Sequence, residues 1–176
     1  DELVDYFNNL KKRLFVGAFA IYFTKEFNIN KKDLEAMLDW IADKLDNVVR
    51  VVKRNGYEGL IIRADVPVIL LFKHKRTGFD KFVSFKEIYE IDHLCSNGCR
   101  IIVMRPRDIA IPGVHYYLLN LARTYKIEFR EIELTRDEIA ALYAVAAGTL
   151  MRADLMNRYV NKAEDVVEKI KKTITS

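Results

Sequence analysis

Four consecutive side chains that could bind an anion follow the most apolar segment of this 176-residue sequence. They are Lys73, His74, Lys75 and Arg76. Open α/β sheets place ligands beyond the carboxyl ends of their strands, and cationic side chains there can contact phosphates. The further cations that would extend this surface are Lys81, Arg105 and Arg107. The spacing therefore predicts an anion-binding site, although a charged strand end can also simply keep a sheet soluble.

Five strands and several helices are predicted to position this cluster. The strands are expected over residues 48–52, 59–63, 66–75, 100–104 and 127–132. Residues 66–72 are apolar at nearly every position instead of alternating, which is typical of a central strand covered on both faces. Pro67 suits only the beginning of such a strand. The pattern predicts an α/β domain with a mixed sheet between helices.

The helices are predicted from spacing and from capping residues. Asn30 is a plausible N-cap for a helix whose buried stripe comprises Leu34, Met37, Leu38, Ile41 and Leu45. Ser84–Glu87 and Thr135–Glu138 match capping boxes, which satisfy free amide groups at helix starts. The second box opens a helix rich in small residues, where another backbone could approach closely. A first helix over 2–27 and a final helix over 161–172 complete the prediction.

The middle of the chain, residues 33–132, resembles the restriction-endonuclease-like superfamily of PD-(D/E)XK nucleases, in particular archaeal Holliday-junction resolvases and Mrr-type endonucleases. The segments that carry the resemblance are Val48-Val49-Arg50, Gly56-Tyr57-Glu58-Gly59-Leu60-Ile61-Ile62, Val68-Ile69-Leu70-Leu71-Phe72-Lys73-His74-Lys75 and Val83-Ser84. The resemblance implies a core of helix, three strands, helix, strand, helix and strand. It also implies a magnesium site whose positions would be Glu35, Glu58, Lys73 and Lys75.

Hydrolysis of a phosphodiester needs oxygen ligands for a divalent cation and a lysine near the attacking water. Glu58 and Lys75 could fill two catalytic roles. The pattern breaks at Lys73, which strand alternation places on the face of Lys75, so that a cation stands where the family has its second acidic ligand. Asp65 or Asp39 could replace that ligand. In an active enzyme the metal ligands would then be Glu35, Glu58 and Asp65.

We predict one domain over residues 1–176, with the nuclease-like core at 33–132, an N-terminal helix at 1–30 and C-terminal helices at 135–176. The expected function is DNA binding by a catalytically degenerate nuclease-like scaffold that needs no cofactor. The alternatives are an active magnesium-dependent endonuclease and a non-catalytic assembly subunit. The expected partners are DNA and a second copy of the chain, or a larger assembly.

Composition sets weaker bounds. The net charge of +4, from 29 basic and 25 acidic residues, favours an anionic partner only mildly. The longest apolar run near the N-terminus is too short to span a membrane, so a cytoplasmic location is expected. The absence of glutamine suggests a thermophilic, archaeal source. Neither a glycine-rich phosphate loop nor a serine nucleophile elbow is visible. Cys95 and Cys99 are expected to be buried free thiols, with a disulfide of the kind found in thermophiles and a zinc site including His93 as the alternatives.

Overall fold

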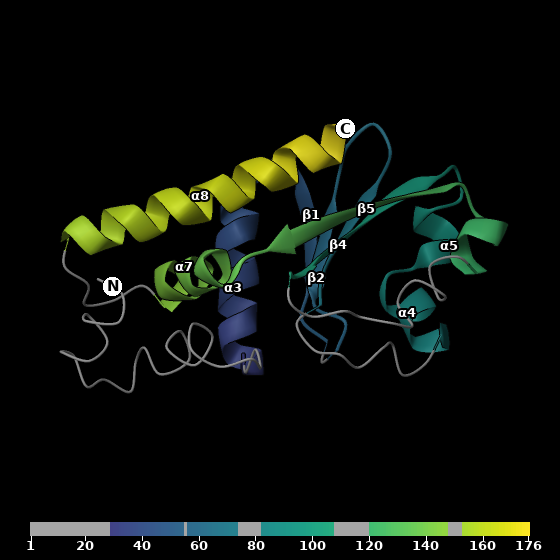
Figure 1. Cartoon of the computed structure of the whole chain (residues 1–176). Coiled ribbons are helices and arrows are strands. Elements are labelled where there is room, and N and C mark those ends of the chain that lie inside the picture. Colours follow the sequence, from purple (N-terminus) through teal and green to yellow (C-terminus); the bar gives the residue numbers. More distant parts are fainter. Residues whose placement is uncertain (1–28, 55, 74–81, 108–119, 148–152) are drawn as a thin grey trace.

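A computed structural model describes residues 29–54, 56–73, 82–107, 120–147 and 153–176 of the chain (Figure 1). Its elements are α3 (Lys31–Lys44), β1 (Val48–Val52), β2 (Gly59–Ile62), β3 (Val68–Phe72), α4 (Phe82–Ile88), α5 (Ile91–Leu94), β4 (Cys99–Pro106), β5 (Ile127–Leu134), α7 (Arg136–Ala147) and α8 (Ala153–Thr175). Residues 120–124 are also helical. The predicted helix over 2–27 lies outside the described residues. Within the described ranges, no helix combines the length and apolar character needed to cross a membrane.

The strands form one five-stranded mixed sheet in the order β1-β2-β3-β4-β5. Strands β1, β2 and β3 are an antiparallel meander, whereas β4 runs parallel to β3, and β5 runs parallel to β4. The α/β class and the five predicted strands are confirmed. The parallel pairs bring the carboxyl ends of β3, β4 and β5 to one edge of the sheet, which is where the cations of interest follow.

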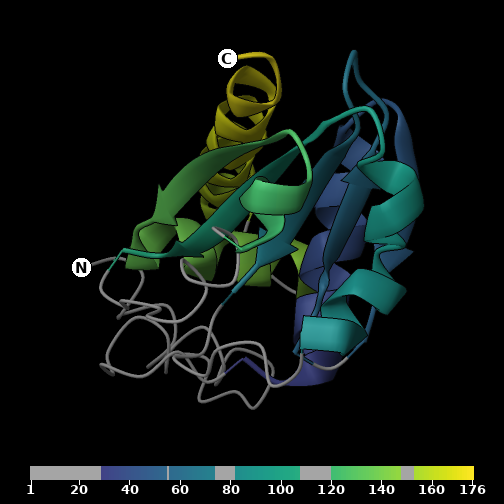
Figure 2. The ribbon, with the colours of Figure 1, turned by 90° about the vertical axis from the view of Figure 1, so that its right-hand side faces the viewer.

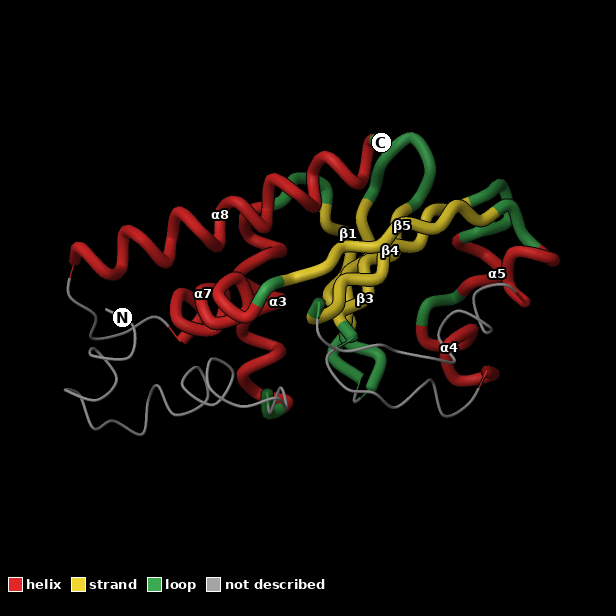
Figure 3. The backbone as a smooth tube through the Cα atoms, in the orientation of Figure 1, coloured by secondary structure: helices red, strands yellow, loops and turns green. Residues whose placement is uncertain are grey.

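Helices cover both faces of the sheet (Figures 1 and 2). Helices α3, α7 and α8 pack on one face, against the even-numbered residues of β2, β3 and β4. Helices α4 and α5 pack on the other face, against the odd-numbered residues. Figure 3 shows the sheet running between these two layers. All five residues of β3 are buried, which confirms the prediction that this strand is central.

Helix α3 forms as its sequence predicts. The side chain of Asn30 accepts a hydrogen bond from the backbone N–H of Asp33 at 2.9 Å and so caps the helix. The predicted apolar stripe is buried. Full burial of one large aliphatic side chain contributes about 1.5–3 kcal/mol, so this stripe fixes α3 against the sheet.

The two predicted capping boxes have different outcomes. Thr135 and Glu138 form theirs: the N–H of Thr135 donates to Glu138 Oε1 at 3.0 Å, and the N–H of Glu138 donates to Thr135 Oγ1 at 3.2 Å. Ser84 does not begin a helix, because α4 already starts at Phe82. The helix expected after Ser84 is also interrupted sooner than predicted. Glu90 adopts a left-handed conformation with φ of 50°, which separates α4 from α5.

Helix α8 is longer than predicted, and the small residues of α7 face inward. Helix α8 begins at Ala153 instead of residue 161 and ends at Thr175. Ala140, Ala141 and Ala144 of α7 are buried in the core that α3 and α8 share. The small-residue surface is therefore used within the chain. It gives no support to a homodimer, which stays a prediction.

Cys95 and Cys99 form a disulfide, with their Cα atoms 4.9 Å apart. The expectation of two free thiols was therefore wrong. The alternative zinc site was wrong as well, because both sulfurs are bonded to each other and His93 is exposed. The bond joins the end of α5 to the first residue of β4 across the turn at Gly98, whose φ of +99° favours glycine.

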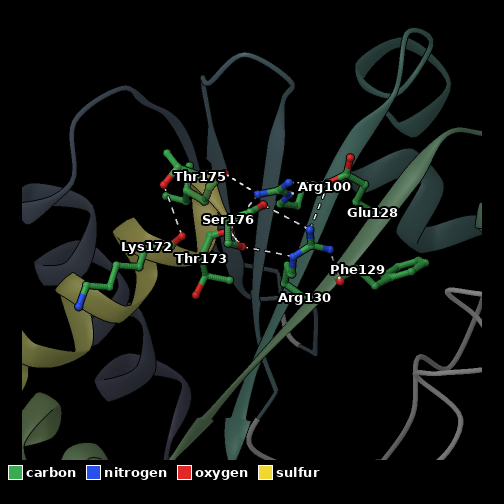
Figure 4. Close-up of polar contacts among 9 residues, drawn as sticks. Arg100, Glu128, Phe129, Arg130, Lys172, Thr173, Thr175 and Ser176 are labelled. Atoms are coloured by element: carbon green, nitrogen blue, oxygen red, sulfur yellow. Dashed lines mark hydrogen bonds and ion pairs between the residues drawn. The ribbon is translucent and has the colours of Figure 1, made fainter.

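The carboxyl end of α8 is held by Arg100 of β4 (Figure 4). Arg100 is buried, and its Nη1 donates to the carbonyl oxygens of Thr173 at 3.1 Å and Ile174 at 2.8 Å. The same side chain donates to Glu128, and the hydrogen bond and charge of Arg100 hold the pKa of that carboxyl below its usual range. Arginine here satisfies terminal helix carbonyls and favours the negative end of the helix dipole.

Arg100→Ala is expected to lower the free energy of unfolding by about 2 kcal/mol, because charged hydrogen bonds to α8 are lost. Urea denaturation measures this loss. Arg130→Ala is the matched control, because Arg130 also contacts the end of α8 but its side chain is 37% exposed. That variant should lose less than about 1 kcal/mol. Equal losses in both variants would show that Arg100 does not anchor the helix.

Candidate strand-end site

The buried Glu58 and Lys73 lie at the same end of the β2–β3 hairpin. Glu58 precedes β2 and Lys73 follows β3, and these strands are antiparallel, with Gly59 opposite Leu71. The N–H of Phe72 donates to the carbonyl oxygen of Glu58 at 3.0 Å, which extends the pairing to this end. Glu58 is 3% exposed and Lys73 is 5% exposed. A carboxylate and an ammonium are thus both removed from water here, which requires compensating contacts.

The backbone of Gly56 supplies such contacts to both side chains. Its N–H donates to Glu58 Oε1 at 3.1 Å, and its carbonyl oxygen accepts from Lys73 Nζ at 3.3 Å. Gly56 has a φ of +86°, a conformation that residues with side chains rarely adopt. The backbone of Gly56 therefore connects the two buried charges.

Tyr89 completes this cluster, although its place in an apolar helical pattern does not mark it as part of a site. Its hydroxyl donates to the carbonyl oxygen of Tyr57. Burial raises the pKa of Tyr89 well above its usual value, and the Glu58 carboxylate raises that pKa further, whereas Arg50 lowers it. Tyr89 is therefore a neutral hydrogen-bond donor that fixes the backbone between Gly56 and Gly59.

Asp65 and Asp39 lie away from this cluster, and Glu35 is paired within its own helix. Glu35 lies on α3, which covers one face of the sheet, whereas strand alternation places Lys73 on the face of Leu71, which α4 covers. Glu35 pairs instead with Lys31 of its own helix, at 3.9 Å. Asp65 is exposed in the turn after β2, at the opposite end of the hairpin from Glu58. Asp39 is exposed and pairs with Lys53 at 2.9 Å.

The structure describes only some of the cationic side chains that were predicted to bind an anion. Lys75, Arg76 and Lys81 lie outside the described residues, as does His74. Arg105 is described, and it lies beside Lys73. The N–H of Lys73 donates to the carbonyl oxygen of Met104 at 2.9 Å, so the parallel pairing of β3 and β4 continues to this edge. Neighbouring strands are about 4.8 Å apart, which makes Lys73 and Arg105 adjacent on one face.

Arg105 and Arg107 are paired with carboxylates of β5. Arg105 donates to Glu131 through Nε and to Glu133 through Nη2, the latter at 2.9 Å. Arg107 Nε lies 3.7 Å from Glu133 Oε2. The parallel register of β4 and β5 places Arg105 opposite Glu133. Sequence reasoning missed these two glutamates, because the register between strands that far apart is not encoded locally.

The residues that surround Lys73 do not fit a magnesium site. Magnesium requires oxygen ligands, whereas the described residues at this end of the hairpin offer one carboxylate, already bound to Gly56, and one ammonium. Over the described ranges, no three histidine, cysteine, aspartate or glutamate side chains gather in a way that could hold a metal ion. We therefore derive no chemical step through magnesium.

The fold and the site define an α/β protein with a mixed five-stranded sheet and buried charges at its strand ends. No protein-family model, no curated protein and no solved structure matches the chain.

Proposed function

We propose that this protein binds DNA through the phosphate backbone, on a nuclease-like scaffold whose metal site is degenerate. The observation that carries the proposal is the position of Arg105, adjacent to the buried Lys73, at the carboxyl ends of two parallel strands. Open α/β sheets bind ligands at such ends, and lysine and arginine are prominent among the side chains that contact phosphates. The exposed Arg107 extends the same edge.

The degenerate character of the site rests on the surroundings of Lys73. In the nuclease superfamily that the sequence resembles, this position carries an acidic metal ligand. Here an ammonium occupies it and donates to the carbonyl oxygen of Gly56, beside the buried Glu58. A bound divalent cation would be repelled by this charge. The separation of Asp65 from Glu58 also weighs against an active magnesium-dependent endonuclease.

DNA binding across a salt series tests the proposal. The affinity of the protein for a duplex or a four-way junction should fall steeply with salt, with a slope of about 0.9 in log K against log salt for each phosphate that the protein neutralises. Arg107→Ala should lower that slope by about 0.9, because one phosphate is no longer neutralised. Fluorescence anisotropy with labelled DNA measures both quantities.

Arg63→Ala is the matched control for this experiment. Arg63 is also exposed, but it follows β2 at the opposite end of the hairpin from Lys73. Its removal changes the net charge equally and should leave the slope unchanged. An equal effect of both variants would indicate nonspecific attraction by the whole chain, and no binding at low salt would favour the assembly-subunit alternative.

A further inference from the structure

Glu133 bridges the two arginines that the proposed DNA site would use. Its Oε1 accepts from Arg105 Nη2 at 2.9 Å, and its Oε2 lies 3.7 Å from Arg107 Nε. Glu131 accepts from Nε of the same Arg105. These carboxylates therefore occupy N–H groups of the guanidinium fork with which arginine binds a phosphate in a bidentate manner.

The orientation of Arg105 does not depend on these carboxylates alone. Its Nη1 donates to the backbone carbonyl oxygens of Pro106 at 3.2 Å and Arg107 at 3.5 Å, and its side chain is only 16% exposed. The side chains of Glu131 and Glu133 are 52% and 47% exposed. Ion pairs with such exposed partners contribute little to stability, so an incoming anion can replace them while Arg105 keeps its orientation.

We infer that Glu131 and Glu133 are an autoinhibitory pair that competes with DNA phosphates for Arg105 and Arg107. This inference rests on the proposed function and adds its regulation: the two carboxylates weaken binding, and a phosphate displaces them when DNA binds. A single phosphate between Arg105 and Arg107 would take the bridging place of Glu133. The geometry thus makes the binding strength depend on two acidic residues of β5 that do not themselves contact DNA.

Glu133→Gln tests this inference with the same labelled duplex and the same salt series. Loss of the competing charge should tighten binding at low salt by roughly fivefold, which corresponds to the upper range for an exposed ion pair. The salt slope should stay close to that of the unsubstituted protein, because Arg105 and Arg107 neutralise the same phosphates once the carboxylates are displaced. A purely structural role for Glu133 would change thermal stability and leave the affinity for DNA unchanged.

Glu128→Gln is the matched control. Glu128 lies on the same strand and pairs with an arginine of β4, but at the other end of β5, beside α8. This variant removes the same charge and should leave the affinity for DNA as it is in the unsubstituted protein. Equal tightening by both variants, or no tightening by Glu133→Gln, would overturn the inference while DNA binding itself stands. Absence of binding in the unsubstituted protein would overturn both proposals.

Glu131→Gln provides a second, independent variant should Glu133→Gln fail to fold, as judged by thermal denaturation. Glu131 accepts from Arg105, whereas Glu133 spans both arginines. Removing the charge of Glu131 should therefore tighten binding in the same direction by a smaller factor. An unchanged affinity in a folded Glu131→Gln protein, with Glu133→Gln unfolded, would also overturn the inference.

Discussion

Lys73→Glu is expected to destabilise the fold strongly in the absence of metal and to create affinity for a divalent cation. The substitution places a second carboxylate at a position that is 5% exposed, beside Glu58 at 3% exposed. Loss of one partner from a buried charged cluster typically costs about 3–5 kcal/mol, because the remaining charge is left uncompensated. A manganese or magnesium ion would offset the repulsion, since both carboxylates offer hard oxygen ligands.

The measurement is urea denaturation of Lys73→Glu with a chelator and with manganese, together with a calorimetric titration. Lys73→Gln is the matched control, because it also loses the ammonium and its hydrogen bond to Gly56 but introduces no carboxylate. Only the glutamate variant should be restabilised by metal. Equal responses of the two variants, or a titration without heat, would show that residue 73 does not correspond to the metal-ligand position of the nuclease superfamily.

The sequence predicted the local elements of this fold well because their signals are local. The continuous apolar run of β3 indicated a strand buried on both faces, and the Asn30 cap with its apolar stripe indicated α3. The break between α4 and α5 was not predicted, because the left-handed backbone of Glu90 has no signature in a residue type that usually avoids it. The early start of α8 was missed because no capping pattern marks it.

The candidate site was predicted in part. The resemblance singled out Glu58 and Lys73, and the antiparallel hairpin brings both to Gly56. Glu35 and Asp65 were grouped with them from the order of elements, but Glu35 pairs with Lys31 of its own helix, and Asp65 lies at the opposite end of the hairpin. The position of a carboxylate relative to a strand does not indicate whether the backbone of a turn will bind it.

The pairing of β4 with β5 determines which carboxylates the arginines contact. Local sequence patterns do not predict that pairing either. Arg105 and Glu133 are 28 residues apart in sequence, and they meet because β4 and β5 are parallel and in a register that no short segment specifies. The bond between Cys95 and Cys99 is different, because these residues are only four apart in sequence and the bond depends on the tight turn between α5 and β4.

Gly59→Ala is expected to lower the free energy of unfolding by about 3 kcal/mol or more, because overpacking against a backbone atom cannot be relieved by a rotamer change. A Cβ at Gly59 would lie 2.3 Å from the carbonyl oxygen of Leu70 and 2.6 Å from the hydroxyl oxygen of Tyr89. Leu70 belongs to the neighbouring strand β3, so the strands would have to separate. Urea denaturation compares the variant with Gly56→Ala, whose added Cβ meets nothing within 4 Å.

Gly56→Ala should cost only about 1–2 kcal/mol, from the positive φ alone. The double variant Gly59→Ala with Tyr89→Phe distinguishes the two contacts of the added methyl group. Removing the hydroxyl relieves only the contact with Tyr89, so the contact with the Leu70 carbonyl should keep the double variant unstable. Recovery of stability in the double variant would mean that Tyr89, and not the β3 backbone, requires glycine here. Persistent instability would tie Gly59 to the close strand pairing that holds Glu58 and Lys73 at one end of the hairpin.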